Sequence, residues 1–476
     1  MSLSVLIVLH EFGHYLPAKA FKTRVEKFFL FFDPWAKRRS KEQLVSFREQ
    51  KAKDYEAEGE AFKPSFWDKF EPKSLALLRK KIGETEYGIG WLPLGGYVKI
   101  SGMIDESMDK EQMALPPQPW EFRSKPAWQR LIIMLGGVIV NFVLAWAIYV
   151  FVSGYYGDTT VATNSIKDGY IIDNPVLKSV GLKTGDQIVS VNGTTYENLA
   201  DLSYSFITAK EAHVVRDGEE LKIDFPVDFP GQLTKSKKED GALLKLRVPF
   251  YIKGAIDTMQ NAKAQIKEGD VIVGINNRKL KYFDQFPDVL NAYKNQTVTA
   301  TILRDKNEIK LPLNINEDGK LGIIRGGNID VFDKLGYVDV VRKEYTFTES
   351  FGAGTTKFIK QFKKYGEQLK LIFTPSTGAY QGVGGFYAIY NVFPDTWSWE
   401  FFWGITAFLS IMLGVLNLLP IPALDGGHVM FLLYEMISGR KPSERFLERA
   451  QMIGFLILIA LVLFANGNDI FKAITN

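Results

Sequence analysis

The sequence predicts a polytopic α-helical membrane protein with four transmembrane helices, a membrane-associated β-hairpin or sheet, and two small tandem β domains. Three observations support this fold class: long uncharged apolar runs, a shorter apolar run that contains two histidines and a glutamate, and a sequence motif that occurs twice. The average composition of the 476 residues is 46% hydrophobic and 24% charged, as in an ordinary soluble protein. This average hides the alternation of long apolar runs with long polar stretches. A chain of this length has room for about three domains.

The composition excludes several classes of function. Lys and Arg (58) nearly balance Asp and Glu (54), and the net charge of +4 gives no argument for nucleic acid binding. Cysteine is absent, which excludes disulfides, thiol nucleophiles and cysteine-ligated zinc. Any histidine chemistry must use His10, His14, His213 or His428.

Three apolar segments are predicted to span the membrane, at 127–157, 397–424 and 450–468, because each carries about 20 residues without a charge. The first span is predicted at 1–22, where SLSVLIVL is followed by HEFGH. It lacks the basic start and small-residue cleavage site of a secretory signal peptide. Only nine residues precede His10, about half a bilayer of helix, which indicates a clipped or misassigned start.

The distribution of Lys and Arg predicts the orientation of the spans. Basic residues gather in 23–126 and 425–449, so these loops are expected to be cytoplasmic. The block 158–396 and both termini are then extracytoplasmic.

The first loop contains a charged insertion and a region of different character. Residues 37–86 are rich in Lys and Glu and predict a solvated helical insertion. Within 86–102, the run YGIGWLPLGGYVKI predicts a hairpin over Tyr87–Ile100 beside the membrane. Gly95-Gly96 permits a close backbone approach, or is simply a turn.

The extracytoplasmic block contains an internal repeat. GLKTGDQIVSVNG begins at Gly181 and QIKEGDVIVGINN at Gln265, each reading as a turn, a strand and a turn with asparagine. This predicts β domains at 158–248 and 249–328, and the phrase resembles PDZ domains of bacterial proteases. Peptide capture and steric gating by these domains remain equal alternatives. Within the following segment 329–396, KFIKQFKKYGEQLKLIF predicts an amphipathic helix, either lying at the interface or packed normally.

His10-Glu11-Phe12-Gly13-His14 has the H-E-x-x-H pattern. On a helix, histidines four residues apart face the same way, so both imidazoles can bind one Zn²⁺. Glu11 is then placed to take a proton from the attacking water. Histidine and glutamate inside an apolar helix are costly, which favours a functional role for them.

A catalytic zinc needs a third protein ligand. Glu26 is the nearby carboxylate, but the better candidate is Asp425, which follows the third predicted span (397–424) in NLLPIPALDGGH. Pro420 and Pro422 break the helix there, and non-helical backbone at membrane depth must line protein or a water-filled cavity.

HEFGH, PLGGYVK, the tandem PDZ-like repeats and NLLPIPALDGGH together resemble the site-2 protease family, in its bacterial regulator-of-sigma (RseP-like) type. The resemblance implies that His10, His14 and Asp425 bind zinc and that Glu11 is the catalytic base. It also implies that Asn417 holds the substrate backbone. PLGGYVK would receive the substrate, with Gly95 and Gly96 at its turn.

The resemblance implies an intramembrane zinc endopeptidase of the bacterial inner membrane, with the PDZ-like pair in the periplasm. Its partners would be the lipid bilayer and pre-trimmed single-span proteins, such as an anti-sigma factor or remnant signal peptides. One rival is a membrane-tethered protease that acts on soluble peptides. Another is a PDZ scaffold or transporter with a vestigial metal site. The sequence determines neither the substrate nor the oligomeric state.

Overall fold

The computed structural model describes residues 2–31, 36–38, 45, 48–50, 70–72, 78–90, 95–103, 116–235, 242–257, 259–394 and 396–475. The chain divides into two compact units. The first, called here the helical unit, comprises Met1–Val152, Thr348–Phe362 and Ala388–Gly467. The second, called here the β-rich unit, comprises Ser153–Phe347, Lys363–Tyr387 and Asn468–Asn476.

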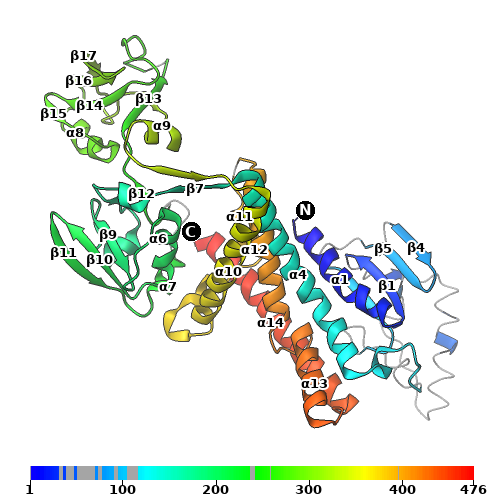
Figure 1. Cartoon of the computed structure of the whole chain (residues 1–476). Helices are drawn as coiled ribbons and strands as arrows, with labels where there is room; N and C mark the ends of the chain where they lie inside the picture. Colours follow the sequence, from blue (N-terminus) through cyan, green and yellow to red (C-terminus); the bar gives the residue numbers. More distant parts are fainter. Residues whose placement is uncertain are drawn as a thin grey trace. The chain divides into compact units, whose positions relative to one another are not determined.

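The described part of the helical unit is built mainly from long helices, a four-stranded sheet called here the small sheet, and a separate pair of short strands (Figure 1). Its helices are α1 (Ser2–Ala20), most of α4 (Ala127–Tyr156), part of α10 (Phe347–Ile372), most of α11 (Phe386–Val392), α12 (Trp399–Asn417), α13 (Asp425–Ser438) and most of α14 (Glu444–Thr475). Its strands are β1 (Val25–Leu30), β2 (Ala36–Arg38), β3 (Phe70–Pro72), β4 (Leu78–Ile82), β5 (Thr85–Ile89) and β6 (Tyr97–Ile100).

Three helices in the described part of the chain are long and apolar enough to cross a membrane: α4, α12 and α14. They correspond to the three uncharged runs. Helix α1 is not among them, because His10, Glu11 and His14 lower the hydropathy of its second half. The protein is a membrane protein, and a fourth span at α1 remains a prediction.

The small sheet corrects the predicted hairpin. Its strand order is β4-β5-β1-β6, with β5 parallel and β6 antiparallel to β1. Tyr87–Ile100 is therefore not a hairpin, because VEKFFL in β1 supplies the aromatic strand that separates its two arms. The hairpin is instead β4–β5, whose turn begins at Gly83 with a positive φ of 61°.

The predicted helical insertion at 37–86 lies largely outside the described residues. Where that segment is described, residues 48–50 are helical. The other described pieces are strands, because β2 pairs with β3 and β4 joins the small sheet. The helical prediction is therefore wrong for 37–38, 70–72, 78–82 and 85–86.

The first half of α10 is a packed helix within the helical unit. The indole Nε1 of Trp146 in α4 donates a hydrogen bond to Thr355, 2.9 Å away. Phe142 and Phe362 stack edge to face with centroids 5.6 Å apart. A Cβ added to Gly354 would lie 2.4 Å from Val150 Cα, so this glycine permits close helix contact. These contacts favour the packed alternative over a helix lying free at the interface.

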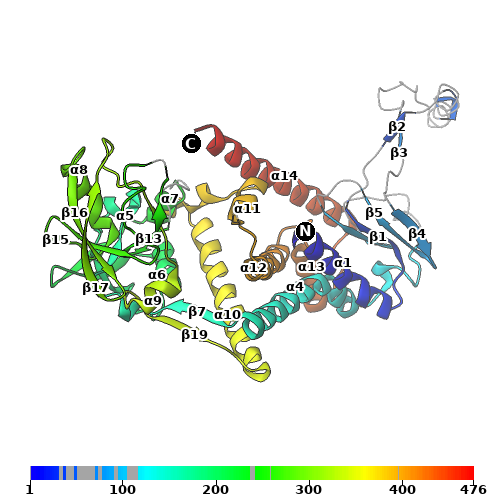
Figure 2. The same cartoon turned by 90° about the horizontal axis from the view of Figure 1, so that it is seen from above.

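The β-rich unit contains two separate hydrophobic cores. The first gathers around Tyr170, Phe206 and Phe229, and the second around Phe250, Ile272 and Phe286. The strands are β7 (Asp158–Val161), β8 (Tyr170–Ile171), β9 (Gln187–Val191), β10 (Glu211–Arg216), β11 (Glu219–Asp224), β12 (Lys245–Leu246), β13 (Phe250–Ala255), β14 (Val271–Ile275), β15 (Arg278–Lys279), β16 (Thr297–Arg304), β17 (Asn307–Asn314), β18 (Ile323–Arg325) and β19 (Val340–Lys343). The helices are α5 (Pro175–Ser179), α6 (Leu199–Ser205), α7 (Phe229–Leu233), α8 (Phe286–Ala292) and α9 (Ile329–Lys334). Figure 2 shows β7 and β19, which pair antiparallel, as a ribbon.

The sequence repeat corresponds to a repeated buried ion pair. Asp186 accepts two hydrogen bonds from Arg216, each 2.7 Å, and Asp270 accepts two from Arg304 with the same lengths. Both aspartates are essentially fully buried. Each follows a glycine with φ near +100°, in the turn that leads into β9 or β14.

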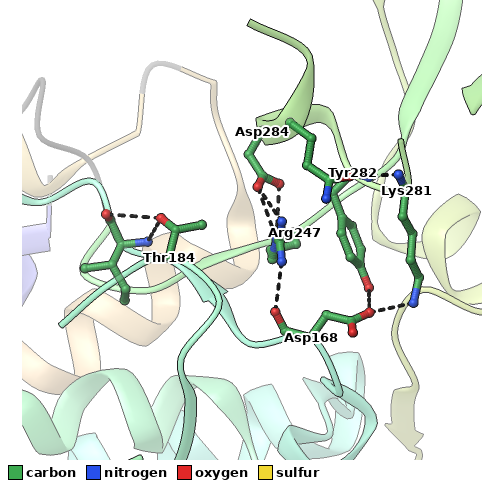
Figure 3. A network of polar contacts seen from close by, with 8 residues as sticks. Asp168, Thr184, Arg247, Lys281, Tyr282 and Asp284 are labelled. Atoms are coloured by element: carbon green, nitrogen blue, oxygen red, sulfur yellow. Dashed lines mark hydrogen bonds and ion pairs between the residues drawn. The ribbon is translucent and has the colours of Figure 1, made fainter. Parts of the chain in front are cut away.

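A polar network joins the two cores (Figure 3). The carboxylate of Asp168, next to the first core, accepts hydrogen bonds from Lys281 and Tyr282 of the second. Arg247 lies between Asp168 and Asp284. It donates one hydrogen bond to the Asp168 carbonyl at 3.1 Å and another to the Asp284 carboxylate at 2.7 Å. These bonds connect residues far apart in the sequence and so link the two cores.

Asp168→Asn is expected to loosen this network. Hydrogen bonds from Lys281 and Tyr282 hold the pKa of Asp168 below its usual value of about 3.9. The carboxylate's contribution to stability is therefore complete above that pH and is lost as the pH falls through the lowered pKa. At pH 7, hydrogen exchange of full-length Asp168→Asn should speed up about two- to fivefold around residues 278–285, the range for a partly exposed ion pair.

Asp173→Asn is the control for Asp168→Asn. It breaks one exposed ion pair, with Lys245, beside the β8–β12 pairing of the first core. It should leave exchange at 278–285 unchanged. Equal exchange in both variants would show that Asp168 does not link the two cores.

Candidate metal centre

Helix α1 presents His10 and His14 on one face. They are four residues apart, and each is only 7% exposed. Their rings pack edge to face with centroids 4.9 Å apart. The sequence spacing therefore produces a paired, buried imidazole site.

Asp425 reaches the histidines from a break between two helices. Helix α12 ends at Asn417, and α13 begins at Asp425, so residues 418–424 are not part of either helix. A Cβ at Gly426 would lie 2.3 Å from the carbonyl oxygens of Leu418 and Leu419, so the start of α13 requires a glycine there. Residues 425–449, predicted as a loop, thus contain a helix, whose Val429 and Leu432 are buried in the core around Ile133.

The three side chains converge in the helical unit. Asp425 Oδ2 lies 3.3 Å from His10 Nε2 and 3.4 Å from His14 Nε2. The two Nε2 atoms are 3.3 Å apart. The three candidate ligand atoms therefore form a nearly equilateral triangle.

This triangle fits a zinc ion. Tetrahedral zinc with ligands at about 2.0–2.1 Å requires ligand atoms about 3.3–3.4 Å apart. Asp425 Oδ2 is buried without a hydrogen-bond partner in the described residues, as expected of an atom shaped to bind a cation. Three protein ligands leave a fourth position for water or substrate, as in catalytic zinc sites.

The other ring nitrogens are held by neighbouring groups on α4. His14 Nδ1 lies 2.9 Å from the Ile133 carbonyl, which favours a proton on Nδ1 and leaves Nε2 for a metal. Asn141 Nδ2 lies 3.1 Å from His10 Nδ1, while Asn141 Oδ1 has no partner in the described residues. Turning this amide by 180° would let Oδ1 accept the Nδ1–H of a zinc-bound His10.

Glycines let α4 approach this close to α1. A Cβ at Gly137 would lie 2.5 Å from His14 Nε2 and 2.6 Å from His10 Cε1. A Cβ at Gly13 would lie 2.4 Å from the Gly136 carbonyl oxygen. Sequence reasoning missed Asn141 and Gly137, although a carboxamide within an uncharged run was the available signal.

The remaining predicted site residues lie around the same centre. Asn417 Nδ2 is 3.1 Å from His10 Nε2. Glu11 is half-buried, and a Cβ at Gly96 would lie 3.4 Å from Glu11 Cγ. Gly95 precedes Gly96 at the entry to β6. His428, one turn beyond Asp425, is not part of the metal-ligand group found among the described residues.

Comparison with known proteins agrees with this class of site. The model of peptidase family M50 matches residues 72–461. A "Putative zinc metalloprotease" of Clostridium acetobutylicum is 25% identical over 99% of this chain and 95% of its own length. Protease RseP of Yersinia pestis is 25% identical over 98% of this chain and 96% of its own length.

Apolar helices and the family match together define a zinc metalloprotease of the membrane. The chain belongs to peptidase family M50, the site-2 protease family. Its cofactor is zinc.

Proposed function

We propose that this protein hydrolyses peptide bonds inside transmembrane segments of other membrane proteins. We assign His10, His14 and Asp425 as zinc ligands, Glu11 as the general base, and Asn417, Gly95 and Gly96 to substrate binding. The observation that carries the proposal is the triangle of ligand atoms, with edges of 3.3–3.4 Å, contributed by His10 and His14 of α1 and by Asp425 at the start of α13. Intramembrane ionisable groups are costly and are retained for function.

The chemistry requires a base and a Lewis acid beside one peptide bond. When bound, zinc polarises the scissile carbonyl and makes a water molecule acidic at neutral pH. Glu11 takes the proton of the attacking water and passes it to the leaving amine. The Asn417 amide, within reach of the same centre, donates a hydrogen bond to the substrate backbone.

The substrate must be unwound before it can be cleaved, because a transmembrane helix hides its peptide bonds in its own hydrogen bonds. Strand β6 is at an edge of the small sheet and pairs with β1 alone among the described strands. An extended substrate segment pairing with β6 would recover the lost backbone hydrogen bonds. Gly96, against Ile7 and Glu11, would let that segment approach the centre.

The β-rich unit supplies the selection of substrates in this proposal. Its two cores are PDZ-like domains on the periplasmic face of the inner membrane, which exclude proteins with bulky outer domains. Substrates are then single-span proteins trimmed beforehand, of the anti-sigma factor or remnant signal peptide kind. The four-span topology, with basic loops inside, places the metal centre within reach of cytoplasmic water.

Cleavage by the full-length protein in liposomes tests the proposal. A co-reconstituted single-span reporter should be cut within its apolar segment. A zinc chelator should stop the cutting, and added zinc should restore it. A soluble peptide of the same residues around the cut site should be cleaved at least about tenfold more slowly, because it lacks alignment in the bilayer. Faster cleavage of the soluble peptide would favour the tethered-protease alternative.

A further inference from the structure

A cavity in the helical unit has none of the three candidate metal ligands in its lining. Its volume is about 210 Å³, well above the roughly 15 Å³ that one water molecule needs. It is lined by residues 102–103, 117 and 122–123, which precede α4, by the start of α4, by α13, by the loop after α13 and by the start of α14. Nothing in the proposed proteolysis uses this space.

The cavity lies at the same end of two membrane-spanning helices. Arg130, in its lining, immediately precedes the uncharged run that begins at Leu131 in α4. Gln451, also in its lining, is the second residue of the uncharged run of α14. Since an apolar span ends where the lipid headgroups begin, the cavity is at headgroup level.

The charges around the cavity leave a cation without an acidic partner. Arg130 is paired with Glu435 at 2.5 Å, and Arg123 with Glu121 at 2.6 Å. Lys441 makes no ion pair among the described residues, and its Nζ is 3.4 Å from a backbone carbonyl. Glu444 is exposed in the first turn of α14, where the helix dipole stabilises its charge.

The rest of the lining is largely apolar. Phe122 and Leu432 are buried, and Phe431 and Leu447 are half-buried against the same space. A free inorganic anion would gain little from these side chains. A lipid offers both a phosphate for Lys441 and a glycerol with acyl methylenes for the apolar wall.

We propose that this cavity binds the phosphodiester headgroup of an anionic phospholipid. The phosphate would lie beside Lys441, the lining cation that has no ion pair among the described residues, and the glycerol end would lie against Phe431 and Leu447. Basic pockets between membrane helices are suited to anionic headgroups. The site contains none of the candidate metal ligands, so lipid binding can be tested separately from the proposed proteolysis.

The experiment is lipid binding to the full-length protein in detergent, measured by native mass spectrometry. Phosphatidylglycerol should bind, and phosphatidylcholine should bind at least fivefold more weakly. Lys441→Gln should weaken phosphatidylglycerol binding about fivefold, the effect of one interfacial cation. Arg440→Gln is the matched control, since Arg440 is the adjacent exposed cation and is not in the lining. It should bind as the unaltered protein does.

A second variant tests the apolar wall without changing charge. Leu447→Trp fills the cavity and should also reduce phosphatidylglycerol binding. A melting temperature equal to that of the unaltered protein would show that this variant is folded. Equal losses in Lys441→Gln and Arg440→Gln would reduce the effect to general surface charge and overturn the proposal. Displacement of the lipid by millimolar inorganic phosphate would identify an ion site and overturn the lipid assignment. Equal binding of phosphatidylcholine would do the same.

Discussion

Glu11→Gln is expected to reduce cleavage of the membrane-embedded reporter by about 10²- to 10⁴-fold, the contribution of a positioned general base. Glutamine keeps the size of the side chain, but it does not accept the proton of the attacking water. Zinc content should be unchanged, because Glu11 is not in the group formed by His10, His14 and Asp425. Reporter cleavage and metal analysis on the same preparation measure both effects.

Glu26→Gln is the matched control, because Glu26 is the other carboxylate close to the motif in sequence. The structure places it in the small sheet, where it accepts a 2.7 Å hydrogen bond from Ser101 and pairs with Lys99 at 3.3 Å. Its removal should change cleavage by only a few-fold. Wild-type cleavage by Glu11→Gln would remove Glu11 from the mechanism, and loss of zinc would make it a ligand.

The three candidate metal ligands could be picked out from the sequence because the pattern that marks the histidines is local. His10 and His14 are one helical turn apart, so the spacing alone makes them neighbours. Asp425 could be picked out for another reason. Placing a carboxylate at membrane depth, at the end of an uncharged run and after two prolines, costs free energy, so such a residue indicates a functional role. The structure brings all three within 4.8 Å of one another. Their role as ligands remains the proposal that metal analysis must test.

The supporting contacts could not be predicted, because they depend on which helices meet. Asn141 and Gly137 are more than 120 residues from the histidines they contact, and nothing near them specifies that partner. The predicted hairpin was wrong for the same reason. Tyr87–Ile100 has the composition of two strands, but the β1 strand that separates them comes from a distant part of the chain.

The repeat in the β-rich unit shows the same limit. Asp186 and Asp270 were marked by the repeated Gly-Asp turn. Their arginine partners were not, because Arg216 follows 30 residues after the first aspartate and Arg304 follows 34 residues after the second. A repeat with unequal loops preserves the pairing in space but not the spacing in sequence.

Asp425→Asn is expected to weaken zinc binding by at least about 100-fold. Even neighbours that only support a zinc ligand contribute 10- to 100-fold to affinity, and Asp425 would contact the ion directly. Asparagine preserves the volume at the start of α13, so the tight contacts of Gly426 with residues 418–419 remain. It removes the charge that offsets the ion's own in a membrane-embedded site. Zinc affinity, measured by competition with a chromophoric chelator, tests this directly.

Asn141→Leu is compared with Asp425→Asn because it should cause a smaller loss of zinc affinity. It removes the side chain beside His10 Nδ1 but none of the three candidate ligands, so zinc affinity should fall by only about 10- to 100-fold. The order of affinity should therefore be unaltered protein, then Asn141→Leu, then Asp425→Asn. If Asp425→Asn binds zinc as tightly as the unaltered protein, the third ligand must come from elsewhere, and the short distances from Asp425 to the histidines would need another explanation. If the two variants lose affinity equally, Asp425 acts through the orientation of the histidines and not through a bond to the metal.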